Sequence, residues 1–150
     1  METKEYRTFD KFGWGPGPWQ DEPDKMQFAD TATGLPCLIV RSHTGALCGY
    51  VGVNESHPAY EKPYEDVDVS VHGGLTFSDR CRPNADEAHH ICHVPAPGEP
   101  DHVWWLGFDC AHAGDIAPAV GCVWHEDRYR DIAYIKAEIK RLALQLHAMH

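Results

Sequence analysis

The chain has few basic residues and no cluster of them. Its 150 residues include 13 Lys and Arg against 23 Asp and Glu, which gives a formal net charge of −10. Non-specific binding to nucleic acid or to an anionic membrane requires a basic surface, so we expect neither partner. A cationic ligand or a bound metal suits this charge balance better, although an acidic surface can also serve solubility alone.

Long apolar runs are also absent. No stretch approaches the roughly 18–20 apolar residues of a membrane-spanning helix, and the first seven residues, METKEYR, lack the apolar core of a secretion signal. We therefore predict a cytoplasmic protein with mostly reduced thiols; three disulfides are the alternative if the protein is secreted. The six cysteines are Cys37, Cys48, Cys81, Cys92, Cys110 and Cys122. No two of them form the C-x-x-C pair that is typical of zinc knuckles.

The spacing of apolar residues predicts an α+β fold. Segments typical of strands lie at residues 35–41, 46–53, 66–71 and 103–108. Between residues 129 and 148 apolar side chains recur every three or four positions, which indicates an amphipathic helix. We predict a single domain over residues 1–150, in which the C-terminal helix packs on one face of a curved, mainly antiparallel sheet.

Two other segments are predicted to be less regular. Residues 1–34 should form an irregular N-terminal arm, because GWGPGPW at 13–19 combines glycines and prolines that disfavour helix and central strand alike. The arm either covers the body or forms an aromatic lid over a site. Residues 78–100 are polar and contain four prolines, and we expect at most a short helix there, at 85–90.

Two of the predicted strands end in residues suited to metal binding. One ends in His72, followed by two glycines, and the other is followed by Asp109 and His112. Zinc in catalytic sites takes imidazole and carboxylate ligands and keeps one position for water. We predict a divalent metal, most simply zinc, held by these three residues with His57 as a fourth ligand. Alternatively, the two histidines bond to the backbone and the aspartate caps the next segment.

The same pattern predicts the chemistry. A carboxylate near a metal-bound water is its usual proton acceptor, and we expect Glu55 or Asp115 to act as that base or to orient a ligating histidine. The protein would then be a metal-dependent hydrolase that acts on a small-molecule ester, phosphoester or amide. The sequence pattern indicates no oligomeric state.

Three alternatives to the hydrolase stay open. The protein could be a binding module without chemistry, which predicts a preformed apolar or aromatic pocket and no metal. It could be a cysteine-dependent hydrolase that pairs Cys110 with a histidine. A third arrangement is a structural zinc site, formed by Cys81, Cys92, His93 and Cys110.

Several motifs carry a resemblance to other proteins. CGYVGV at 48–53, HGGLT at 72–76, ICHVP at 91–95 and WWLGFDCAHAGD at 104–115 resemble a group of small bacterial and phage-encoded proteins without an assigned function. The likeness covers about residues 45–145. It implies a compact intracellular domain of mobile-element origin and brings no activity with it.

Overall fold

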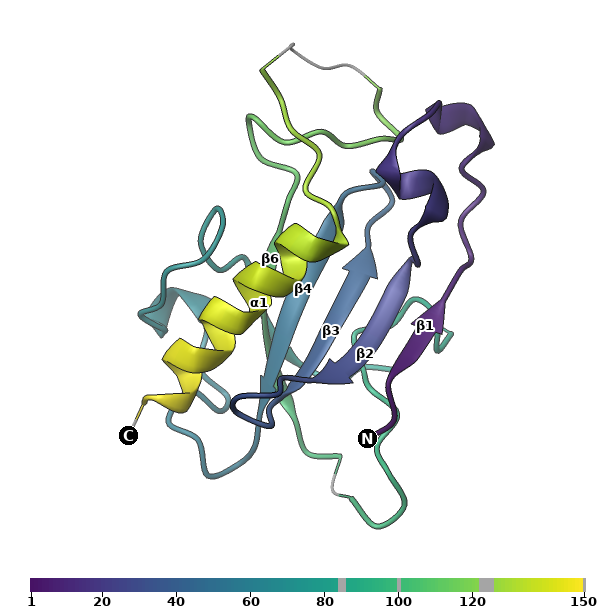
Figure 1. Cartoon of the computed structure of the whole chain (residues 1–150). Coiled ribbons are helices and arrows are strands. Elements are labelled where there is room, and N and C mark those ends of the chain that lie inside the picture. Colours follow the sequence, from purple (N-terminus) through teal and green to yellow (C-terminus); the bar gives the residue numbers. More distant parts are fainter. Residues whose placement is uncertain (84–85, 100, 122–125, 150) are drawn as a thin grey trace.

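The computed structural model, which describes residues 1–83, 86–99, 101–121 and 126–149, contains one six-stranded sheet and one long helix (Figure 1). The strand order is β1-β2-β3-β4-β6-β5, and every neighbouring pair is antiparallel. Helix α1, Ile132–His147, packs on one face. The predicted α+β architecture is confirmed. The strands are β1 Lys4–Tyr6, β2 Lys25–Ala29, β3 Pro36–Arg41, β4 Leu47–Val53, β5 Phe77–Arg80 and β6 Trp104–Asp109.

The central strands are buried on both faces of the sheet. All seven residues of β4 are buried, as are five of the six in β3, which explains their nearly continuous apolar sequences. The register pairs Cys48 with Asp109 and Val53 with Trp104. The start of β4 therefore lies beside the end of β6, at the end of the sheet where Asp109 and His112 lie.

Helix α1 begins at Ile132 because Asp131 caps it, its side chain accepting a hydrogen bond from the Tyr134 amide. The residues of its apolar stripe are at most 1% exposed. Close packing on β4 depends on Gly49, where a Cβ atom would lie 3.0 Å from Ile139 Cγ1. The members of the stripe are Ile135, Ile139, Leu142, Ala143 and Leu146.

The opposite face of the sheet is covered by residues 81–83 and 86–94. A disulfide joins Cys81 to Cys92, and Lys25, which is 1% exposed, donates from Nζ to the carbonyl oxygens of Glu87, His90 and Cys92. The prediction of reduced thiols is therefore wrong for these two cysteines, and the structural zinc site that included them is excluded. Of the other four, Cys37, Cys48 and Cys110 are free and buried, while Cys122 lies outside the described residues.

The structure corrects the sequence prediction in the N-terminal arm. Residues 1–34 were expected to be irregular, yet they contain β1 and β2. Strand β2 lacks the apolar pattern that predicts a buried strand, because two of its inward-pointing side chains are polar. These are Lys25 and Gln27, which are 1% and 0% exposed. Gln27 pairs with the backbone of Val94, so both buried side chains have polar partners.

Two further segments differ from the prediction. Residues 66–71 form no strand, although Val67 and Val71 are buried against the core on the helix side of the sheet. The alternation of apolar and polar residues in this segment therefore reflects the burial of its valines and not pairing with another strand. The short helix expected at 85–90 starts at a residue outside the described part, and residues 86–90 form a turn. Among the described residues, no helix has the length and apolarity needed to cross a membrane.

A buried ionic network fixes the arm to the sheet. Asp24 Oδ1 lies 2.8 Å from both Lys11 Nζ and Arg41 Nε, while its Oδ2 accepts from the amides of Thr8 and Phe9. Burial alone would raise the pKa of Asp24, but these four hydrogen bonds together outweigh it and hold that pKa below its ordinary value. The carboxylate therefore stays ionised in the folded protein.

We expect Asp24→Asn to lower the free energy of unfolding by about 3–5 kcal/mol, because it leaves two buried cations without their shared carboxylate. Denaturant titration measures this change. The matched control is Asp79→Asn, which breaks an exposed pair with Arg82 and should cost less than about 1 kcal/mol. Equal losses in the two variants would contradict the assignment.

Candidate metal centre

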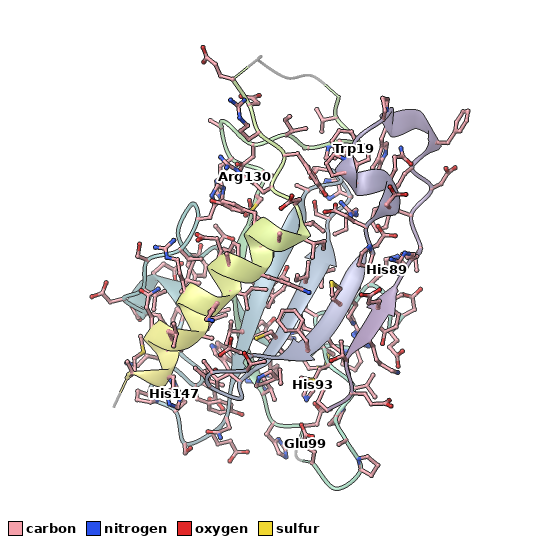
Figure 2. The ribbon with its side chains drawn as sticks, viewed as in Figure 1. Trp19, His89, His93, Glu99, Arg130 and His147 are labelled. Atoms are coloured by element: carbon pink, nitrogen blue, oxygen red, sulfur yellow. A yellow bond between two sulfur atoms is a disulfide. The ribbon has the colours of Figure 1, made fainter. Side chains whose placement is uncertain are left out.

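The candidate site lies at the end of β6, between the loop that follows this strand and the first turns of α1. The Cys110 amide donates to the Leu47 carbonyl at 3.2 Å, which continues the strand pairing one residue past Asp109. Figure 2 shows Arg130 beside the start of α1, and His93 and Glu99 toward the other end of the sheet. The site thus occupies one edge of the molecule.

Three side chains converge there in a group that could hold a metal ion. One ligand atom each from His72, Cys110 and Asp115 lies within 4.8 Å of the other two. Cys110 is 1% exposed. Imidazole nitrogen, thiolate sulfur and carboxylate oxygen are all ligands that zinc accepts in proteins. Of the predicted ligands, only His72 belongs to this group; Asp115 was predicted as a base.

Helix α1 holds His72 in position. The His72 amide donates to Glu138 Oε1 at 2.8 Å, and its ring Nδ1 lies 2.7 Å from Tyr134 Oη. These two helix residues are four positions apart and therefore lie on the same face of the helix. The other ring nitrogen, Nε2, lies 2.8 Å from Asp115 Oδ2. Both ring nitrogens of the imidazole therefore have protein partners, and the Tyr134 contact is of the kind that orients a ligating histidine through its other nitrogen.

Asp115 is a buried carboxylate with charged partners. Burial alone would raise its pKa, but hydrogen bonds from Arg130 Nε, the His72 ring and the His112 amide outweigh it and lower the pKa. The carboxylate is thus ionised at neutral pH. Because it accepts from His72, we assign the proton of that imidazole to Nε2, which leaves Nδ1 to accept from Tyr134.

The surroundings of Cys110 disfavour a cysteine nucleophile. Burial raises the pKa of its thiol well above the usual range, and the nearby Asp115 and Cys48 raise it further. A catalytic thiolate needs an adjacent base, but both ring nitrogens of His72 already have other partners. A metal ion is what would favour the thiolate here, so the geometry suits Cys110 as a ligand.

Asp109 and His112 flank the group rather than belong to it. The two rings of His72 and His112 are 6.0 Å apart between centroids. His112 Nε2 lies 3.2 Å from Asp109 Oδ1, but the geometry does not make a hydrogen bond, and this buried nitrogen has no such partner among the described residues. Thr76 Oγ1 donates to the other oxygen of Asp109 at 3.0 Å.

Glu55 and His57 lie at the other end of the sheet. They follow β4, whose last residue, Val53, pairs with Trp104 at the start of β6; the group lies beyond the end of β6. The His57 ring packs at the C-terminal end of α1, where Nε2 lies 2.7 Å from the Leu146 carbonyl, and its Nδ1 accepts from the Ala59 amide. We therefore leave both out of the site.

Comparison with known proteins does not assign this site. No family model, no curated protein and no solved structure matches the chain.

Gly73 makes room for His112, which gives a test of the loop geometry. With φ of +68°, a Cβ at this position would lie 2.3 Å from His112 Nε2, whereas Gly74, with φ of +78°, has nothing within 4 Å. We expect Gly74→Ala to cost about 1–2 kcal/mol of stability for its left-handed backbone. Gly73→Ala should cost about 1–3 kcal/mol more, because the ring must move.

Thermal or denaturant unfolding of the two alanine variants measures this difference. Imidazole signals in NMR spectra then show whether His112 has moved. Equal stability losses with an undisturbed His112 signal would contradict the packing described for this loop.

Proposed function

We propose that the protein binds zinc through His72 Nε2, Cys110 Sγ and a carboxylate oxygen of Asp115, and that it is a zinc-dependent hydrolase. The observation that carries the proposal is the convergence of these three ligand atoms within 4.8 Å. Catalytic zinc sites keep three protein ligands and a fourth position for water. Zinc lowers the pKa of such a water to about 7 and polarises the bond to be cleaved. The substrate class is a small ester, phosphoester or amide.

The protonation states support zinc as the cation. Cys110 would lose its proton on binding, and with the Asp115 carboxylate the two ligands balance the charge of Zn²⁺. His72 would bind through Nε2 as a neutral ring, so that its proton moves to Nδ1 and is donated to Tyr134 Oη, which lies 2.7 Å away. Each buried charge then has a partner, as a dry site requires.

Asp109 and His112 supply the proton acceptor in this proposal. His112 Nε2 lies 3.2 Å from Asp109 Oδ1, and a hydrogen bond between them would hold the ring proton on Nε2. Nδ1 would then be free to accept a proton from a zinc-bound water. Such proton transfers contribute about 10²–10⁴-fold to a rate. The roles differ from the sequence prediction, which placed both residues among the ligands.

The compartment also belongs to the proposal. The sequence predicts the cytoplasm, whereas the Cys81–Cys92 disulfide favours an oxidising compartment, because structural disulfides are rare in the cytosol. The zinc site needs neither of these cysteines. Its Cys110 is free in the folded chain.

We expect untagged protein to bind one equivalent of zinc, and His72→Ala and Cys110→Ser to lose it. Elemental mass spectrometry measures the zinc content, and a cobalt-substituted sample should show a thiolate-to-cobalt charge-transfer band that Cys110→Ser removes. The matched control is Cys37→Ser, which alters another buried free thiol outside the group. Wild-type protein without zinc affinity, or full affinity in Cys110→Ser, would exclude the site.

Hydrolysis is tested with zinc-loaded protein on nitrophenyl acetate, nitrophenyl phosphate and an anilide. Turnover should cease with a chelator and return with zinc, and His112→Ala should lower kcat about 10²–10⁴-fold while zinc stays bound. Tightly bound zinc without turnover of any of the three substrates would instead favour a non-catalytic zinc protein.

A further inference from the structure

Arg130 is held at the rim of the candidate metal centre by two contacts. Its Nε donates to Asp115 Oδ1 at 2.8 Å, and its Cζ lies 4.8 Å from the centre of the Tyr134 ring. The side chain is 26% exposed. An ion pair and a stacked aromatic ring together fix the plane of a guanidinium group, so this side chain is oriented before any ligand arrives.

Among the described residues, the rest of the guanidinium has no partner. In the described part of the chain, Arg130 Nη1 and Nη2 make no hydrogen bond or ion pair, which leaves four N–H donors unused. Arg41 differs, since all three of its nitrogens bond to protein groups and its side chain is fully buried. Both terminal nitrogens of Arg141 donate hydrogen bonds, Nη1 to Glu138 and Nη2 to Ser70.

Asp115 links this free edge to the metal ligands. Its Oδ1 binds Arg130, while its Oδ2 lies 2.8 Å from the His72 ring. The guanidinium and the ligand group are therefore separated by a single carboxylate. A ligand group bound to the free edge of Arg130 would therefore lie close to the carboxylate that belongs to the candidate metal-binding group.

We propose that Arg130 is the oxyanion-binding residue of this site and that the substrate carries a phosphate or carboxylate group. A planar guanidinium with both terminal nitrogens free matches two oxygens of such a group. The zinc-dependent chemistry rests on the proposed function, but anion binding by Arg130 does not. A small anion fits better than a polyanion, because the chain as a whole has a net charge of −10.

The test is binding of inorganic phosphate and of acetate, measured by calorimetry on zinc-free and zinc-loaded protein. Phosphate as the better ligand identifies a phosphoester substrate, and acetate a carboxylate-bearing one. Arg130→Gln should weaken binding about tenfold or more, whereas Arg130→Lys should weaken it less, since it keeps the charge and loses the two-pronged geometry. Arg82→Gln, which removes an equal charge from an exposed pair with Asp79, should bind as the wild type does.

Circular dichroism and thermal unfolding establish whether each variant is folded. If Arg130→Gln does not fold, the test uses Arg130→Lys, which keeps a cation beside Asp115. Unchanged anion binding in the Arg130 variants, equal weakening in Arg82→Gln, or no anion binding by wild-type protein would overturn the inference. Zinc content of the same samples separates the two proposals. If the protein binds zinc but the Arg130 variants bind anions as the wild type does, only this inference fails. If the protein binds no zinc but the Arg130 variants lose the anion binding of the wild type, only the zinc-dependent hydrolase fails.

Discussion

The ion pair between Asp24 and Arg41 is the interaction on which the arrangement of the chain depends. Arg41 ends β3, is fully buried, and binds Asp24, the Pro23 carbonyl and the Gly45 carbonyl. Its Nη1 also donates to Tyr129 Oη. One guanidinium thus joins the N-terminal arm, the β3–β4 turn and the segment that leads into α1.

The same network reaches the candidate metal centre through the start of α1. Glu22, which accepts from the Tyr129 hydroxyl, also accepts from the Ile132 amide with its second oxygen. This amide belongs to the first turn of the helix, whose free N–H groups need acceptors. The helix that is placed in this way carries Tyr134 and Glu138, the two residues that hold His72. The position of His72 in the site therefore depends on the contacts that Glu22 of the arm makes with the start of α1.

The sequence predicted what apolar spacing can report. Strands β3, β4 and β6 and the helix follow from buried apolar runs, and His72 and Asp115 were placed at the site from their positions at strand and loop ends. Strand β2 was missed because Lys25 and Gln27 are buried with polar partners, whereas polar residues in a sequence usually indicate an exposed segment. Glu55 and His57 were misplaced because the pattern of a single strand does not show how that strand pairs with its neighbours. In the structure β4 pairs with β6 so that both residues lie at the end of the sheet opposite to the candidate site.

Cys110 was considered from the sequence as a nucleophile and not as a partner of His72 in a metal site. Burial in the structure raises the pKa of its thiol. The property that disfavours catalysis by the thiol is compatible with metal binding, because the sulfur is dry and lies within 4.8 Å of a fixed imidazole and an ionised carboxylate. Asp115 divides its two oxygens between His72 and Arg130, so one buried carboxylate fixes both the His72 ring and the Arg130 guanidinium.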